Sequence, residues 1–118
     1  MKFLLDTNVI SELARPRPEV RVAQFISQAE ADTLAISAMT LAEIRIGALR
    51  QKDPPRRTAL IEWTVAVIAE YRDRILAYDQ DVALVHGKIG AEVLDRGRTT
   101  RTADLVIAAT AIHHDLTL

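Results

Sequence analysis

Residues 3–8 read FLLDTN, an apolar run that leads directly into an acid and two small polar residues. The apolar part predicts a short buried strand over residues 2–5 that ends before Asp6. In open α/β sheets, ligands bind in the crevice beyond the carboxyl ends of the strands. Asp6 could instead cap a following helix, but an acid at the end of a central strand more often serves function. Asp6 is therefore the first candidate site residue.

Predicted strands alternate with predicted helices along the rest of the chain. Apolar runs predict further strands at residues 34–37, 75–78 and 116–118. Periodic apolar residues predict helices at residues 9–14, 18–32, 40–49, 60–71, 82–93 and 102–114. The two consecutive prolines at 54 and 55 are expected to form a loop. This alternation predicts an α/β fold of three layers, α/β/α, with a central parallel sheet and an incomplete last strand.

Length and composition indicate one globular domain over residues 1–118. The hydrophobic fraction of 49% and the charged fraction of 26% are ordinary, so neither a disordered nor a fibrous class is indicated. Cysteine is absent, which excludes a disulfide framework, a thiolate zinc site and a cysteine nucleophile. No apolar stretch is long enough for a membrane span, and no signal peptide precedes the first strand, so we expect a cytoplasmic protein.

The basic residues are mostly arginines, although the formal net charge is only −1. They gather in three groups, Arg15/Arg17/Arg21, Arg50/Lys52/Arg56/Arg57 and Arg96/Arg98/Arg101. The simpler interpretation is that these are solvated surface charges and charges near helix C-termini. Contact with RNA is the alternative, because a guanidinium group matches phosphate with two parallel hydrogen bonds.

Two further acids, Glu43 and Asp104, also stand near the starts of predicted helices. Each has a structural alternative: Glu43 has capping-box spacing from Thr40, and Asp104 would complement the dipole of the last helix, which Thr102 could cap. Together with Asp6 they are expected at one edge of the sheet. Carboxylates about 5 Å apart repel by roughly 3 kcal/mol per pair, so a divalent cation, a buried arginine or a shared proton must offset the repulsion. Oxygen ligands favour Mg²⁺ or Mn²⁺ over zinc.

Three segments that contain these acids share the pattern of one known family. They are residues 3–12 (FLLDTNVISE), 36–47 (ISAMTLAEIRIG) and 102–111 (TADLVIAATA). Together they resemble the PIN-domain ribonucleases, and most nearly the VapC toxins of type II toxin–antitoxin systems, including the FitB-like branch. The resemblance runs from the first strand to Leu118 in the order and spacing of the family. The short motif DTN alone is weak, whereas the three segments together are specific.

The resemblance implies an endoribonuclease that binds Mg²⁺ or Mn²⁺ in an acidic pocket. By the match of motifs, Asp6 and Asp104 would be the principal metal-binding carboxylates. Glu43 would contribute directly or through a water, so all three acids are expected to be catalytic. The metal would lower the pKa of a water, orient the phosphodiester and neutralise the leaving oxygen. No histidine base is then required, and a partner-facing or helix-capping role suits the histidines His86, His113 and His114.

Partners are also implied by the resemblance. A VapB-type antitoxin would hold the toxin inactive, toxins of the family form homodimers, and DNA is reached only through the antitoxin. The predicted helix at residues 60–71 is apolar over more of its circumference than one core-facing stripe requires. We expect the antitoxin to cover an apolar groove beside this helix.

One departure from the family concerns its fourth acid, which usually follows the next strand. This chain ends before that position, and Asp115 precedes the last predicted strand, on the wrong side to replace it. The sequence therefore predicts a domain truncated at the C-terminus, with weaker metal binding, impaired activity and an exposed sheet edge.

Other functions remain open on the residues alone. The main alternative is a non-catalytic acidic pocket that receives an arginine from a partner and acts in a toxin–antitoxin repressor complex. A haloacid-dehalogenase-like phosphatase would need an Asp where Asn8 stands. A response-regulator receiver would need adjacent acids and a late lysine, but Lys88, the last lysine, falls inside a predicted helix.

Overall fold

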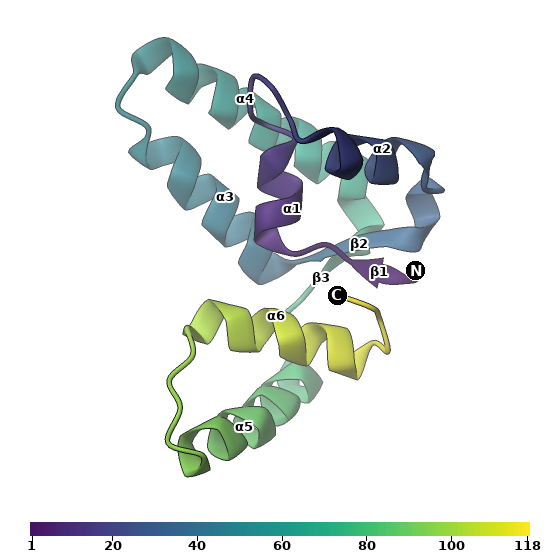
Figure 1. Cartoon of the computed structure of the whole chain (residues 1–118), viewed down its shortest axis with the longest axis vertical. Coiled ribbons are helices and arrows are strands. Elements are labelled where there is room, and N and C mark those ends of the chain that lie inside the picture. The colour runs from purple at the N-terminus through teal and green to yellow at the C-terminus, as the bar shows by residue number, and fades with distance from the viewer.

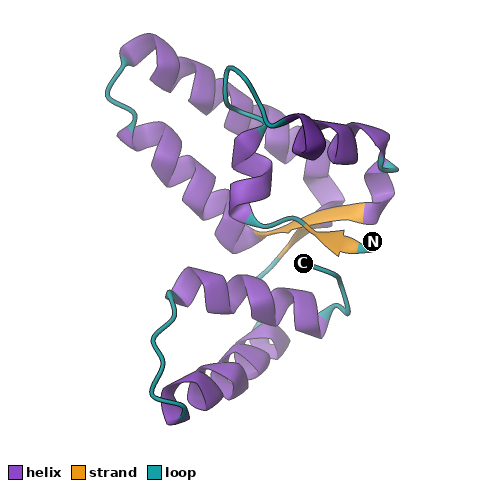
Figure 2. Cartoon of the chain, in the orientation of Figure 1, coloured by secondary structure: helices purple, strands orange, loops and turns teal.

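Six α-helices surround a small parallel sheet in the computed structural model, which describes residues 1–118 (Figure 1, Figure 2). The strands are β1 (Phe3–Leu4), β2 (Leu34–Ser37) and β3 (Ile75–Leu76). The helices are α1 (Thr7–Glu12), α2 (Val20–Gln28), α3 (Ala38–Arg50), α4 (Pro54–Tyr71), α5 (Gln80–Asp95) and α6 (Thr102–His113). None of these helices has the length and apolar character needed to cross a bilayer. The predicted α/β class with a parallel sheet is confirmed.

The sheet has the order β1-β2-β3, and β2 is its buried central strand. Leu34 and Ile36 join a core cluster with residues of α1, α3 and α4, whereas Ala35 joins a second cluster with residues of α6. Successive residues of a strand point to opposite faces, so β2 holds a helical layer on each side. Figure 1 shows α1 to α4 on one side of the sheet and α5 and α6 on the other.

The predicted last strand is reduced to a single bridge. Thr117 pairs in parallel with Phe3, accepting a hydrogen bond from the Leu4 N–H at 2.8 Å and donating one to the Lys2 carbonyl at 3.0 Å. This contact lies on the side of β1 opposite β2 and brings the two chain ends together (Figure 1). The strand predicted at residues 116–118 is therefore present at the edge of the sheet, but only Thr117 pairs with β1.

At the helix starts, one prediction was wrong and two structural alternatives are not realised. Pro54 and Pro55 are the first residues of α4 and not a loop. Proline lacks a backbone N–H, and the N–H groups in the first turn of a helix have no acceptor within the helix, so no hydrogen bond is lost. Asp53 caps that helix by accepting from the Arg56 N–H at 3.3 Å. Glu43 is not in a capping box, since α3 begins earlier and Ser37 is its cap. The residue that precedes α6 is Arg101, so the predicted cap falls inside the helix.

Candidate active site

Asp6 lies between the end of β1 and the start of α1, as the sequence predicted. It occupies the position before the first residue of α1, but its side chain makes no capping hydrogen bond and is in no ion pair. The residue is half-buried. The structural alternative, a side-chain helix cap, is thus not realised, and the carboxylate remains available to a ligand.

Asp104 lies on the first turn of α6 and faces the same cleft as Asp6. The cleft has a volume of about 450 Å³, and Asn8, Ile107 and Leu118 complete its lining. Ile107 is also part of the core cluster that packs α6 against the sheet, so this packing places Asp104 opposite the end of β1. Asp104 is exposed and, like Asp6, has no ion-pair partner.

Glu43 has partners of its own, which lie on the segments that carry this pair of acids. Its Oε1 accepts a hydrogen bond of 2.6 Å from the Thr7 hydroxyl, and the guanidinium group of Arg101 donates to its Oε2. The Thr7 hydroxyl also lies 3.0 Å from that of Thr40. An exposed arginine therefore compensates Glu43, in place of the buried arginine that the sequence analysis considered for offsetting carboxylate repulsion. Glu43 does not line the cleft.

The donors of the cleft suit a hard cation. Two carboxylates and the side-chain amide of Asn8 line it, and no imidazole does. Oxygen ligands of this kind favour Mg²⁺ or Mn²⁺. Because no cationic side chain neutralises Asp6 or Asp104, a divalent cation would lower the electrostatic cost of their shared cleft. The residues present therefore fit a divalent cation at this position.

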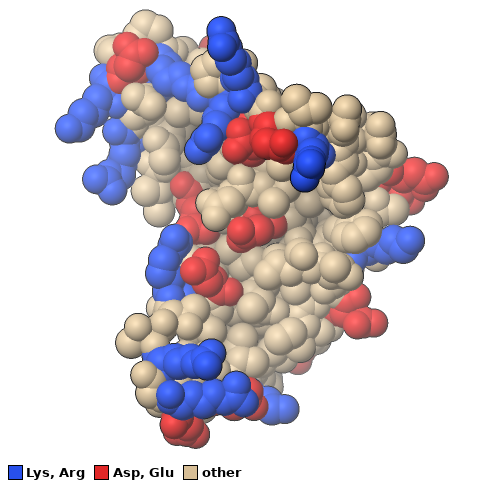
Figure 3. Space-filling view, viewed as in Figure 1, with Lys and Arg blue, Asp and Glu red and all other residues tan.

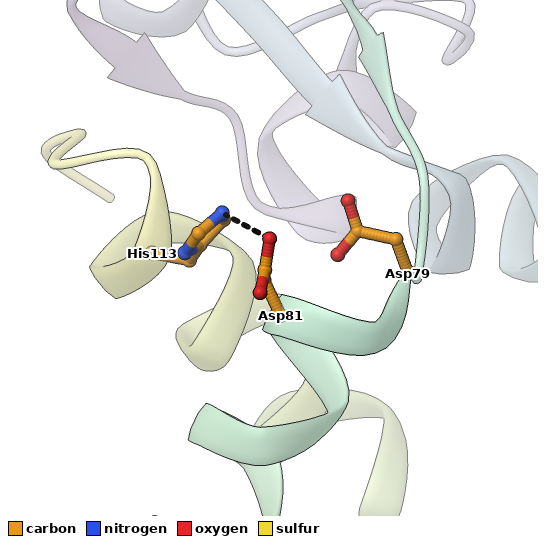
Figure 4. Close-up of side chains that lie close together, drawn as sticks. All are labelled: Asp79, Asp81 and His113. Carbon is orange, nitrogen blue, oxygen red and sulfur yellow. Dashed lines mark ion pairs between the residues drawn. The ribbon is translucent and has the colours of Figure 1, made fainter.

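A second cluster of possible metal ligands lies elsewhere, at the surface (Figure 4). Ligand atoms of Asp79, Asp81 and His113 lie within 4.8 Å of one another, and all three residues are exposed. Asp79 caps α5 by accepting from the Val82 N–H at 2.9 Å. His113 follows Asp104 by nine residues, about 13.5 Å along the axis of α6, so this cluster lies at the far end of that helix from the cleft.

Acidic groups gather along the middle of the face seen in Figure 3, with basic groups on the left edge above and below them. Asp6, which precedes α1, and Asp104 on α6 share an acidic cleft, which agrees with the family pattern suggested by the sequence. The model of the PIN domain family matches residues 3–118. The chain belongs to the PIN-domain family.

Two relatives of this PIN domain cover nearly all of the chain. Toxin FitB from Neisseria gonorrhoeae is 35% identical over 98% of this chain and 84% of FitB. VapC ribonuclease Y4jK from Sinorhizobium fredii is 35% identical over 95% of this chain and 81% of that protein. The resemblance to VapC and FitB toxins is confirmed.

Solved structures show the same fold. The crystal structure of FitAcB from Neisseria gonorrhoeae has a TM-score of 0.88 and 35% identity, covering 97% of this chain and 83% of that chain. The structure of VapBC-5 from Mycobacterium tuberculosis, a member of the VapBC family of toxin–antitoxin systems, has a TM-score of 0.70 and 28% identity, covering 98% and 80%.

Two side chains of this PIN domain enter the site without having been predicted there. In the sequence, Arg101 belongs to a basic group interpreted as surface charge, with contact to RNA as the alternative, and Thr7 is one of two small polar residues after Asp6. Both contact Glu43. The signal for Arg101 was its place three residues before Asp104, at the start of the same helix. That spacing alone does not reveal a contact with a residue on α3.

Proposed function

We infer that this PIN-domain protein is a ribonuclease toxin, neutralised by a partner antitoxin. The observation that carries the inference is a pair of acids, Asp6 and Asp104, which face one cleft without a cationic partner. Relatives at 31–35% identity that are named as ribonucleases support nuclease activity. The same names make the non-catalytic binding module the less favoured alternative.

Each acid has a proposed role in RNA cleavage. Asp6 and Asp104 hold Mg²⁺ or Mn²⁺ through their carboxylates, and Asn8 orients a phosphate oxygen or a water at the rim of the cleft. Glu43, held in place by Thr7, acts from the side of the cleft. The bound cation supplies Lewis acidity and a nucleophile at neutral pH. No histidine lines the cleft, so the proposal needs none for proton transfer.

RNA cleavage by this chain should require added Mg²⁺ or Mn²⁺ and should stop in excess EDTA. The reason is that, without a cation, the two unpaired carboxylates repel the reacting phosphate and nothing activates a water for attack. The measurement is gel analysis of single-stranded and stem-loop RNAs incubated with the metal ion alone, the protein alone, and both. Thermal melting in EDTA separates loss of chemistry from loss of fold. A folded, metal-supplied protein that cuts no RNA even in excess over RNA and after long incubation would favour the binding module, whereas slow cleavage agrees with the impaired activity expected for this chain.

An apolar groove beside α4 is the proposed antitoxin site. It has a volume of about 430 Å³ and lies among α1, α2 and α4, where Ile26, Trp63 and Val67 contribute to its lining. This position agrees with the groove expected beside the helix at residues 60–71. The VapBC-5 structure supports a protein partner for this chain. The homodimer implied by the family resemblance stays a prediction, which light scattering of the purified chain tests.

Ala66→Glu should weaken antitoxin binding by at least about 100-fold, because an unpaired carboxylate would be buried under the bound segment. Ala66 lines the groove and is itself exposed in the free chain. Ala69→Glu is the matched control, since it places the same charge on an exposed position of α4 outside this groove. The measurement is the affinity for the antitoxin encoded with this chain. Equal affinities for the two variants would remove the groove from the interface.

A further inference from the structure

Arg101 stands at the start of α6 with an exposed side chain and one acidic partner. Its side chain is 67% exposed, whereas that of Glu43 is only 19% exposed. It precedes the first residue of α6 but makes no side-chain capping bond there. The contact with Glu43 joins residues 58 positions apart, so it is a product of the tertiary fold and not of local sequence. Arg101 is the one basic side chain paired with a predicted site acid.

Glu43 has a donor on each carboxylate oxygen, whereas Arg101 uses only one of its guanidinium nitrogens. Both carboxylate oxygens of Glu43 have a donor, Thr7 on one and Arg101 on the other. A guanidinium group has five N–H donors in a rigid fork. One nitrogen of Arg101 contacts Glu43, and the others make no hydrogen bond to protein. The free part of the fork is exposed, and Arg101 lies three residues before Asp104, which lines the acidic cleft.

We propose that Arg101 binds a phosphate group of the RNA and that Glu43 holds it in place while no RNA is bound. Phosphate and carboxylate compete for the same guanidinium fork, since both accept two parallel hydrogen bonds from it. When the phosphate arrives, Arg101 leaves Glu43, and the carboxylate becomes free to act beside Asp6 and Asp104. The proposal rests on the proposed ribonuclease function and adds to it a residue that touches the substrate.

Two effects of opposite sign follow for Arg101→Gln. The RNA-free variant should bind Mg²⁺ or Mn²⁺ about three- to tenfold more tightly, because a positive charge leaves the neighbourhood of the cation and Glu43 is released. The same variant should bind RNA about tenfold more weakly in EDTA, because a charge-assisted hydrogen bond to phosphate is lost. If Arg101 had only a structural role, the variant would bind both the metal ion and RNA more weakly. Glu43 and the start of α6 would then no longer be held in place.

The first measurement is calorimetric titration of RNA-free protein with Mn²⁺. Wild type, Arg101→Gln, Arg101→Lys and Arg98→Gln are compared after circular dichroism has shown that each is folded. Arg98→Gln is the matched control, because Arg98 lies in the same loop and is in no ion pair. It removes the same charge without touching Glu43 and should leave the affinity unchanged. Arg101→Lys keeps the charge and should stay close to wild type.

The second measurement is RNA binding in EDTA at several salt concentrations. Arg101→Gln should lower the slope of log affinity against log salt by about 0.7, the loss of one phosphate contact on a single strand. Glu43→Gln should tighten RNA binding, and this gain should vanish in the Arg101→Gln background. Asp104→Asn should also tighten binding, but its gain should persist in that background, because Asp104 does not contact Arg101.

The outcomes separate this proposal from the function on which it rests. If wild-type protein binds no metal and cuts no RNA, the proposed function is wrong and Arg101 has no substrate to bind. If wild-type protein binds metal and cuts RNA, but Arg101→Gln has unchanged or weaker metal affinity, only the proposed role of Arg101 is overturned. An unchanged salt slope in Arg101→Gln would overturn it as well. Tighter metal binding together with a shallower slope would establish it.

Discussion

Asp6→Asn should lower the rate of RNA cleavage by at least about 1000-fold, because it removes one of two anionic ligands proposed for the cation. The substitution keeps the shape of the side chain. Stability should stay the same or rise slightly, since Asp6 makes no side-chain cap and no ion pair and shares its cleft with a second acid. Single-turnover cleavage and urea unfolding of the same preparation measure the two effects.

Asp104→Asn should have a comparable effect on cleavage, because the Asp104 side chain faces the same cleft from α6. The double variant should be only slightly slower than either single one, as residues that act as a unit are strongly non-additive. Asp81→Asn is the control, since it removes an acid from the exposed cluster at the other end of α6. If Asp81→Asn abolished cleavage while Asp6→Asn did not, the assignment of the active site to the cleft would be wrong.

Ile36→Ala should destabilise the fold by about 2–5 kcal/mol, a large part of the roughly 5–15 kcal/mol that holds a domain together. Ile36 is 0% exposed at the centre of β2, and it belongs to the core cluster that joins α1, α3 and α4 to the sheet. Removing its side-chain carbons loses buried apolar area and leaves a cavity that close-packed neighbours fill only in part. The midpoint of urea unfolding reports the change.

Ile46→Ala offers the matching comparison. Ile46 lies on α3 and is 55% exposed, so the same truncation should change the free energy of unfolding by no more than about 0.5 kcal/mol. Cleavage by Ile46→Ala should remain at the wild-type level. Equal unfolding midpoints for Ile36→Ala and Ile46→Ala would contradict the core described for this domain.

The agreement between sequence and structure was best where one face of an element is continuously apolar. The strand at residues 34–37 was predicted with its observed bounds, because every residue of β2 is buried and its first three residues are apolar. β1 and β3 are shorter than predicted, since each has a regular ladder only with β2. Lys2 and Leu5, which flank β1, still donate backbone hydrogen bonds to Thr33 and Ala35.

Helix starts were less well predicted from the sequence. A proline pair was interpreted as a loop, although proline is compatible with the first turn of a helix, and Asp53 supplies the cap of α4. Glu43 has the spacing of a capping box from Thr40, but Ser37 is already the cap of α3. Several residues within one turn have the right spacing to cap a helix, and the packing of the helix against the sheet decides which of them is the cap.

The sequence by itself determined the fold class, the family and the positions of Asp6 and Asp104 at the ends of their elements. These depend on local patterns, namely burial periodicity and the chemistry of strand and helix ends. The sequence also led us to expect Asp6, Glu43 and Asp104 at one edge of the sheet. Only the tertiary structure decided that Asp6 and Asp104 line one cleft, whereas Glu43 is outside its lining and pairs with Arg101. The distance between side chains on separate elements is set by how α6 and α3 pack against the sheet, through buried residues such as Ile107 and Ile44. No local sequence pattern determines the distance between these side chains.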